Sequence, residues 1–183
     1  PEVRGGYIDT MLSAYTVNGR TYGLPFMADV CALYYRDDLL SKYGLPVPQT
    51  YDEILEYSKI IMEGEADPDL YGWGYIGVQN ETLACCFLSI YWALGGPDMV
   101  NEDGEFTFDY GIAEKALELM RSYSFGDGIS PAAIGSFDTT TLRNNVMAGN
   151  IVFDTDWLSG YAKYNGDSSS VKDSMKIAAL PTN

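Results

Sequence analysis

Residues 30–63 decide the fold, and they read VCALYYRDDLLSKYGLPVPQTYDEILEYSKIIME. The stretch opens with Val30–Tyr35, a continuous apolar run whose length suits a buried strand. Arg36-Asp37-Asp38 then opens a short helix that we expect to stop at Gly44, because glycine readily takes the left-handed conformation that ends a helix. A strand is therefore followed directly by a helix.

A capping box marks the second helix of this stretch. Thr50 is placed to accept a hydrogen bond at the helix N-terminus, and Glu53, three residues later, can return one to the backbone of Thr50. The apolar residues that follow recur at helical spacing. The sequence predicts a helix over 51–63.

The rest of the chain continues the alternation of strands and helices. Asn18-Gly19 and Asp103-Gly104 are turn sequences, and each predicts a hairpin, with a type I′ turn at Asn18-Gly19. Asp109 caps a helix whose apolar stripe we predict to be Ile112, Ala113, Ala116, Leu117 and Met120. The other expected strands are 71–78, 151–153 and 175–180, and the other expected helices are 80–93, 138–148 and 157–164. This order predicts an α/β fold with helices on both faces of a largely parallel sheet.

Charge and composition exclude several function classes. The 183 residues include 26 acidic and 11 basic side chains, which gives a formal charge of −15, so nucleic acid and anionic membrane surfaces are poor partners. Histidine is absent, which excludes Ser-His-Asp and Cys-His catalysis and imidazole-bound zinc within this chain. Residues 98–105 are acidic but lack the spacing of a calcium loop. We predict no metal and no cofactor.

The three cysteines lie in apolar surroundings. Cys85 and Cys86 sit inside the apolar run Leu83–Leu94, which is too short to cross a bilayer that needs about 20 residues. We expect buried thiols that pack as small hydrophobic side chains, although a bridge from Cys31 to one of the pair is sterically open.

Two motifs allow an enzymatic interpretation. Residues 72–77 fit the pattern GxGxxG, but no strand precedes them and no helix opens at them, so a glycine-rich strand is the better interpretation than a dinucleotide site. The pairs Asp154 with Asp156 and Asp29 with Glu81 could supply the two carboxylates of a glycosidase. Alternatively, such acids lie on the surface or cap a helix, or they hydrogen-bond a neutral ligand.

Trp157 is the most suggestive aromatic residue. It follows Asp156 directly at the end of a predicted strand, so an indole face and a carboxylate can meet the same ligand. Sugars fit this pairing, because ring C–H groups stack on an aromatic face while hydroxyls donate to the carboxylate. Trp92 is a second candidate of this kind, although both tryptophans would equally suit a hydrophobic core.

The order of several segments resembles the extracellular solute-binding proteins of carbohydrate ABC importers, the maltose-binding-protein-like family 1. The matching segments are residues 18–25, 33–40, 48–54, 146–153 with the downstream Trp157, and 179–181. The resemblance covers nearly the whole chain. It departs from the family at Asp156, which stands where small residues or proline are common.

This resemblance implies one lobe of a two-lobed receptor. The implied fold is a type II periplasmic-binding-protein-like lobe with a mixed, mostly parallel sheet flanked by helices on both faces. Residues 1–25 would be the end of the first-lobe connection, 26–181 the second lobe, and 182–183 the start of the return hinge. Sugar would lie in the cleft between the lobes, whose closure signals to the transporter.

The resemblance also implies site residues and partners. Asp29 matches a family acid that hydrogen-bonds sugar, Trp157 matches the stacking tryptophan, and Glu81 lies near another contact region, while Asp156 and Trp92 are added from their chemistry. We expect a monomer without catalysis that binds a mono- or oligosaccharide and ABC permease subunits. Its expected location is extracytoplasmic, in the periplasm or lipid-anchored at the outer face of the membrane. The alternative function is a carbohydrate-active hydrolase with paired carboxylates.

Overall fold

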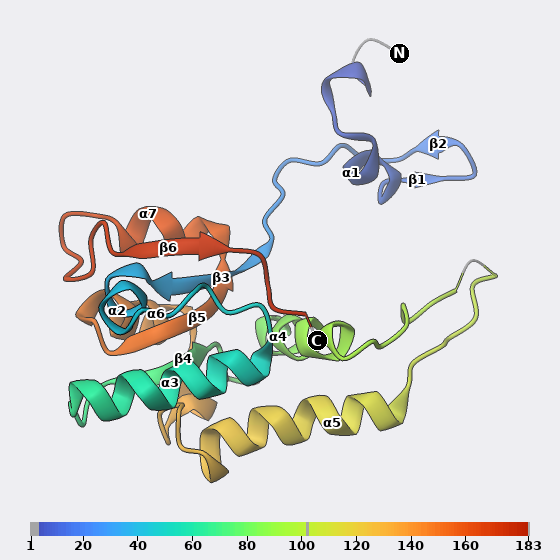
Figure 1. The fold of residues 1–183 in the computed structure, drawn as a ribbon. Helices are drawn as coiled ribbons and strands as arrows, with labels where there is room; N and C mark the ends of the chain where they lie inside the picture. Colours follow the sequence, from blue (N-terminus) through green and yellow to red (C-terminus); the bar gives the residue numbers. More distant parts are fainter. Residues whose placement is uncertain (1–3, 102, 183) are drawn as a thin grey trace. The chain divides into compact units, whose positions relative to one another are not determined.

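The computed structural model describes residues 4–101 and 103–182, which fall into two compact units, Pro1–Val30 and Cys31–Asn183 (Figure 1). The division lies after Val30, whereas the sequence placed the start of the lobe at residue 26. Each unit is described by itself.

The first unit contains the predicted hairpin. Its elements are the 3-10 turn η1 (Arg4–Gly6), the helix α1 (Asp9–Ser13) and the strands β1 (Thr16–Val17) and β2 (Arg20–Thr21). The two strands pair antiparallel. Asn18 and Gly19 have φ values of 51° and 74°, which are the two left-handed positions that a type I′ turn requires. The hairpin prediction is confirmed.

The second unit alternates strands and helices as predicted. Its strands are β3 (Cys31–Arg36), β4 (Tyr71–Tyr75), β5 (Ile151–Trp157) and β6 (Met175–Ala178). Its helices are α2 (Asp37–Tyr43), α3 (Tyr51–Glu65), α4 (Glu81–Ala93), α5 (Tyr110–Arg121), α6 (Thr139–Ala148) and α7 (Tyr161–Tyr164), with short turns η2 (Ser122–Gly126), η3 (Ile134–Ser136) and η4 (Leu158–Gly160). No helix in the described ranges is both long and apolar enough to span a membrane.

The helix ends follow the local signals in the sequence. Thr50 and Glu53 form the predicted capping box at the start of α3, and Asn80, Asp109 and Asp138 each accept backbone hydrogen bonds at the start of α4, α5 and α6. Gly44 takes the left-handed conformation after α2. The predictions for Thr50, Glu53, Asn80, Asp109 and Gly44 are confirmed.

The sheet is mixed, with strand order β4-β5-β3-β6. Only β4 and β5 run parallel, while β3 is antiparallel to both of its neighbours. The prediction of a mostly parallel sheet is therefore wrong. The physical reason is that β3 inserts between two later strands and begins at the edge where β5 and β6 end, so it must run against them.

One face of β5 is covered by α6 and α7. Asp154 and Asp156 point to this face, because alternate residues of a strand share a side. They meet Tyr164 of α7 and Arg143 of α6, which lie 2.6 to 2.9 Å from the carboxylate oxygens. Two polar strand residues are therefore buried beneath two helices.

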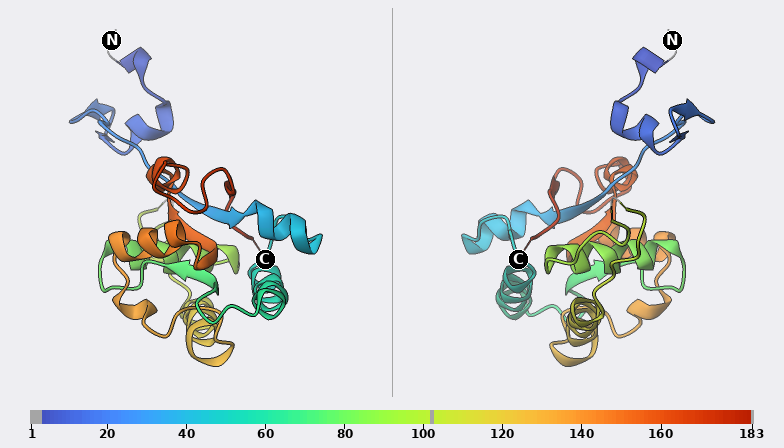
Figure 2. Two further views of the ribbon diagram at one scale, coloured as in Figure 1. Left: turned by 90° about the vertical axis from the view of Figure 1, so that its left-hand side faces the viewer. Right: turned by 90° about the vertical axis from the view of Figure 1, so that its right-hand side faces the viewer.

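The opposite face is covered by α3 and η2. Thr155 points there, and its hydroxyl accepts a hydrogen bond of 3.3 Å from the Trp73 indole of β4. The Trp73 ring packs edge-on against Tyr51 of α3 and Tyr123 of η2. The prediction of helices on both faces is confirmed, and Figure 2 shows the helices packed around the strands of this unit.

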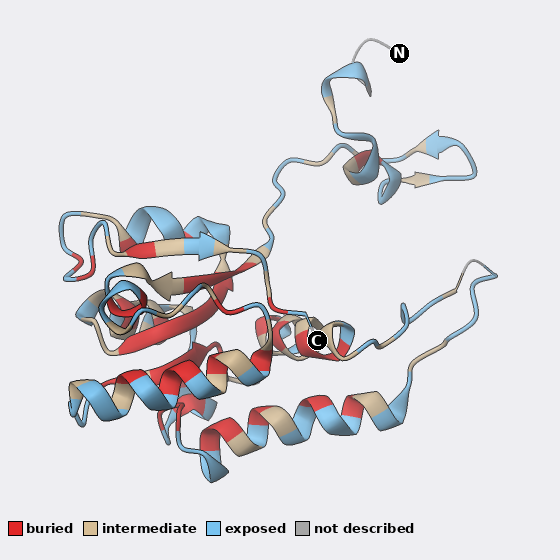
Figure 3. Ribbon diagram, viewed as in Figure 1, coloured by how far each residue is buried: buried red, intermediate tan, exposed pale blue. Residues whose placement is uncertain are grey.

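The core is rich in tyrosine, and Figure 3 shows burial concentrated along β5 and in stripes on α3 and α5. Residues 71–75 form a buried strand, so the glycine-rich stretch is no dinucleotide loop. At Gly77 a Cβ atom would collide with the carbonyl oxygen of Ile134, which explains a glycine there. Cys85 and Cys86 are free thiols on α4, and Cys86 is buried.

Two smaller predictions need correction. The residues around Asp103-Gly104 make a turn with a single bridge, Val100 to Phe106, among the described residues, and no regular hairpin strands. Leu117 is 56% exposed, whereas the predicted stripe on α5 buried it. Ala113, Ala116 and Met120 of that stripe are buried.

Candidate functional site

One edge of the sheet brings together the ends of three strands. β5 ends there at Trp157, and because β3 is antiparallel to it, β3 begins at the same edge with Cys31 opposite Trp157. β6 ends there too, with Ala178 beside Leu33. β4 runs parallel to β5, so the segment that leads from β4 into α4 also leaves from this edge (Figure 1).

Trp157 is the aromatic residue at this edge. It is half-buried, so part of its indole is open to a ligand. Its backbone is fixed by pairing with β3 and by a hydrogen bond of 2.9 Å that the Tyr34 hydroxyl donates to the Trp157 carbonyl oxygen. The predicted helix start at Trp157 is one residue early, because the strand includes Trp157 and η4 begins at Leu158.

Glu81 and Trp92 lie on the same helix but at opposite ends. Glu81 is exposed in the first turn of α4, and Trp92 is 46% exposed in the last turn. Eleven residues separate them, which at 1.5 Å per residue is about 16 Å along the axis. Glu81 is therefore the member of the pair at the sheet edge, and Trp92 is too exposed to be a core residue.

Asp29 belongs to the first unit and is described there. It is half-buried, and its Oδ1 accepts a hydrogen bond of 3.0 Å from the backbone N–H of Val30. In the sequence it precedes Cys31, the first residue of β3, by two positions.

Asp156 lies inside the protein, and its exposed fraction is 0%. Its Oδ2 accepts a hydrogen bond of 2.6 Å from Arg143 Nε, and its Oδ1 accepts one of 3.2 Å from Arg143 Nη2. This two-point ion pair satisfies the carboxylate within the fold. The prediction that Asp156 contacts sugar is not retained, because the carboxylate has neither exposed surface nor an unused oxygen.

Asp154 completes a buried cluster with Asp156 and Tyr164. The Tyr164 hydroxyl lies 2.6 Å from Asp154 Oδ2 and 2.9 Å from Asp156 Oδ2. Burial, with the charge of Asp156 adding to it, raises the pKa of Asp154 well above its usual value. Burial and the two carboxylates also raise the pKa of Tyr164, so this phenol stays protonated.

The same geometry bears on the hydrolase alternative. Asp154 and Asp156 share a side of the strand, as predicted, but both have an exposed fraction of 0%. A glycosidase needs its two carboxylates on either side of an accessible glycosidic bond. Neither a glycosidase role nor a surface or capping role suits this pair.

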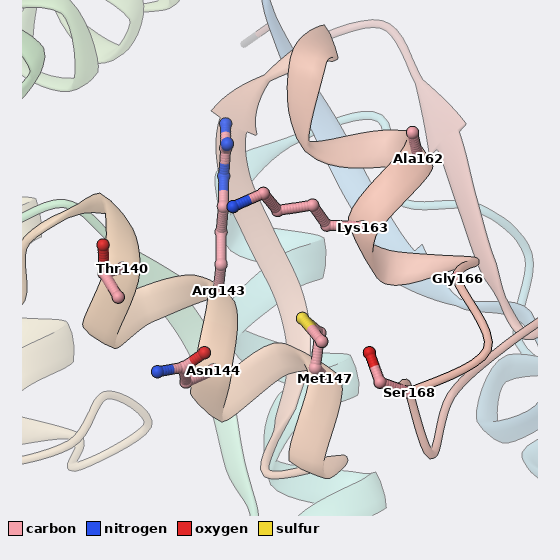
Figure 4. Close-up of a pocket in the computed structure, with 8 residues that line it drawn as sticks. All are labelled: Thr140, Arg143, Asn144, Met147, Ala162, Lys163, Gly166 and Ser168. Carbon is pink, nitrogen blue, oxygen red and sulfur yellow. The ribbon is translucent and has the colours of Figure 1, made fainter.

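A groove opens between α6 and α7, on the outer side of this cluster. It has a volume of about 330 Å³ and is lined by Thr140, Arg143, Asn144, Met147, Ala162, Lys163, Gly166 and Ser168. Figure 4 shows the Lys163 side chain extending toward Arg143. None of the five predicted site residues lines this groove.

Sequence reasoning missed the partners of the two aspartates. Alternation along 154–156 indicated a shared side, but Arg143 and Tyr164 come from separate helices and carry no sequence signal of their pairing. A buried strand continuing through Asp154 is a signal that was available, since charged residues inside such a strand need partners.

Comparisons of sequence agree with this architecture. The family model described as bacterial extracellular solute-binding protein matches residues 2–182. A probable ABC transporter-binding protein of Deinococcus radiodurans is 32% identical over 169 residues, which is 91% of this chain and 40% of the relative. This chain therefore spans less than half the length of that relative.

Comparisons of structure give the same result. Maltose-bound MalE3 of T. maritima has a TM-score of 0.89 at 32% identity, with 98% of this chain and 45% of that chain covered. A solute-binding protein of Agrobacterium radiobacter in complex with ribitol has a TM-score of 0.79 at 22% identity, covering 94% of this chain and 43% of that one. The second likeness concerns the fold alone.

Proposed function

Because this chain belongs to the bacterial extracellular solute-binding proteins, we propose that it is a sugar-binding part of a receptor that delivers a carbohydrate to an ABC importer. The observation that carries the proposal is Trp157, a half-buried tryptophan whose backbone is fixed at the sheet edge. A flat aromatic face on a fixed backbone suits stacking against a sugar ring. The maltose bound to the similar MalE3 supports a neutral saccharide as the ligand.

The other predicted residues take different parts in this proposal. Glu81, exposed at the start of α4, supplies a carboxylate to sugar hydroxyls, and Asp29 supplies another. Trp92, about 16 Å from Glu81 along the helix, would contact only an extended oligosaccharide. Asp156 contributes no contact in this proposal.

Membership of this family also supports a cellular location and partners for the protein. We propose that the protein acts outside the cytoplasm, in the periplasm or lipid-anchored at the outer face of the membrane, as a monomer that docks on permease subunits. It has no catalytic step of its own. Incubation with maltooligosaccharides should release no new reducing ends, and turnover lost on substitution of Asp29 would contradict this.

Calorimetric titration with maltose tests the ligand. Replacing Trp157 by Ala should weaken binding by about 1–3 kcal/mol, the range for losing an aromatic stacking platform. Phe125→Ala is the matched control, because Phe125 is an exposed aromatic side chain on η2, away from the sheet edge. Equal affinities for the Trp157→Ala variant and the unaltered protein would overturn the assignment of Trp157, and the absence of binding to maltose and other neutral sugars would overturn the function.

A further inference from the structure

The buried cluster around Tyr164 contains too many hydrogen-bond acceptors for its protons. The Tyr164 hydroxyl has one proton, yet its oxygen lies 2.6 Å from Asp154 Oδ2 and 2.9 Å from Asp156 Oδ2. Two ionised carboxylates would both be acceptors, and a single O–H cannot make a good hydrogen bond to each of them. One of the two carboxyl groups must therefore carry a proton.

Charge balance points to the group that carries it. Arg143 is the cation of the cluster, and its Nε and Nη2 both donate hydrogen bonds to Asp156. Asp154 has no cation of its own in the described residues, and its Oδ1 is buried without a hydrogen-bond partner. An unpartnered oxygen costs far less free energy in a neutral acid, where it is the carbonyl oxygen, than in a buried carboxylate.

We propose that Asp154 is a neutral acid which donates a hydrogen bond to the Tyr164 oxygen, and that Asp154 and Tyr164 are positioning residues for Trp157. The Tyr164 hydroxyl then donates its hydrogen bond to Asp156, which also accepts hydrogen bonds from Arg143. The resulting chain of hydrogen bonds runs from β5 to α7, back to β5, and on to α6.

The groups that face Asp154 act in both directions, because the charge of Asp156 favours its neutral form, whereas Arg143 and the hydrogen bond of Tyr164 favour its ionised form. They are Asp156 on its own strand, Tyr164 on α7, Arg143 on α6, Tyr34 on β3 and the Cys86 thiol on α4. Burial raises the pKa of the Tyr34 phenol and of the Cys86 thiol, so neither supplies a charge. Burial is also the larger cause of the raised pKa of Asp154, ahead of the charge of Asp156.

The cluster reaches Trp157 along the strand and across it. Asp156 is the residue before Trp157, so fixing its carboxylate fixes the peptide that carries the indole. Tyr34 lies opposite Asp154 on β3, packs its ring against Tyr164 at 4.9 Å, and donates its hydroxyl proton to the Trp157 carbonyl oxygen. The consequence for ligand binding rests on the proposed function, whereas the position of the indole does not.

Two spectroscopic measurements on the 183-residue chain test the proposal without any ligand. With ¹³Cγ-labelled aspartate, the signal that disappears in the Asp154→Asn variant should have the shift of a protonated acid at neutral pH. A carboxylate shift for that signal would overturn the proposal. The asparagine amide can donate to the Tyr164 oxygen as the neutral acid does, so this variant preserves the chain of hydrogen bonds.

The indole N–H signals of ¹⁵N-labelled tryptophan report the positioning role. Asp154→Asn should leave the Trp157 signal in place, while Tyr164→Phe should move it and leave the Trp92 signal unmoved. Tyr161→Phe is the matched control, because the hydroxyl of Tyr161 makes no side-chain hydrogen bond in the described part of the chain. A Trp157 signal unmoved by Tyr164→Phe, or moved as much by Asp154→Asn, would overturn the role.

Maltose titration of the same variants separates this inference from the proposed function. Asp154→Asn should keep the affinity within twofold, and Tyr164→Phe should weaken it about fivefold, which corresponds to the loss of one buried hydrogen bond. If the unaltered protein binds neither maltose nor other neutral sugars, the proposed function fails, and the two spectroscopic results still decide the positioning role. Equal maltose affinity in Tyr164→Phe and the unaltered protein would overturn that role.

Discussion

A Cβ atom on Gly160 would stand 2.6 Å from Asp156 Oδ2. Gly160 is buried at the turn between β5 and α7, where its φ of −68° is open to any residue. The same Cβ atom would also lie 3.2 Å from the Tyr164 ring and 3.5 Å from Arg143 Nε. Space beside the carboxylate cluster, and not backbone conformation, therefore requires glycine here.

Replacing Gly160 by Ala should destabilise the protein by about 1–3 kcal/mol, as overpacking a filled site does. The methyl group must displace the Asp156 carboxylate or the Arg143 guanidinium, because both are held by their ion pair. Urea unfolding measures the loss. Gly135→Ala is the matched control, since a Cβ atom there meets nothing within 4 Å, and a loss of the same size in both variants would contradict the packing argument.

Removing the charge of Arg143 should lower the free energy of unfolding by more than the Gly160→Ala substitution does. Arg143→Met leaves Asp156 ionised and buried without a cation, which costs about 3–5 kcal/mol in comparable buried pairs. The double variant with Asp156→Leu should be more stable than Arg143→Met alone, because it also removes the stranded charge. A single-variant loss below about 1 kcal/mol would mean that the pair behaves like an exposed ion pair.

The stability of the protein should depend on pH through Asp154. A carboxyl group whose folded pKa is raised keeps its proton in the folded state, while the unfolded chain loses that proton above about pH 4. Its contribution is fully present below the unfolded pKa and falls with rising pH until the folded pKa is passed, by up to about 1.4 kcal/mol per pH unit.

The Asp154→Asn variant isolates this contribution. Between about pH 5 and 7 the free energy of unfolding of the unaltered protein should fall relative to that of the variant. Denaturant titrations across that range measure the difference. A constant difference between the two proteins would show that Asp154 has the same protonation state in the folded and unfolded chains.

Ala66 offers a stabilising substitution. It follows α3 with a φ of 51°, in the left-handed conformation, and its N–H bonds the Met62 carbonyl oxygen. Glycine reaches this conformation without the steric cost that alanine bears, so Ala66→Gly should stabilise the protein by about 0.5–1 kcal/mol. Ala148→Gly, in the last turn of α6, should have the opposite sign. Thermal unfolding compares the two, and equal signs would contradict the argument.

Local signals predicted local structure well. The capping box of Thr50 and Glu53 and the turn at Asn18-Gly19 depend on neighbours within four residues, and both formed as expected. The place of β3 in the sheet did not follow from such signals. It depends on which distant strand pairs with it, and the alternation of strands and helices is the same for parallel and antiparallel neighbours.

For the candidate site too, the features that depend on nearby residues were predicted, and those that depend on distant residues were not. Trp157 was expected at the junction of a strand and a helix, and it lies there as the last residue of β5, although the apolar run predicted the strand only over 151–153. The burial of Asp156 was missed, since it depends on Arg143, which lies 13 residues earlier on α6, and on Tyr164, which lies on α7. The ligand contacts of Asp29, Glu81, Trp92 and Trp157 stay predictions.

The alternation of faces along β5 also limits how this protein can change its length. An insertion or deletion of one residue between Ile151 and Asp154 would turn Asp154 and Asp156 toward Trp73, and Thr155 toward Arg143. The contacts of β5 with α6 and α7 on one face and with Trp73 on the other would then be lost together. We therefore expect changes in chain length to cost less stability in the connections on either side of β5 than within the strand itself.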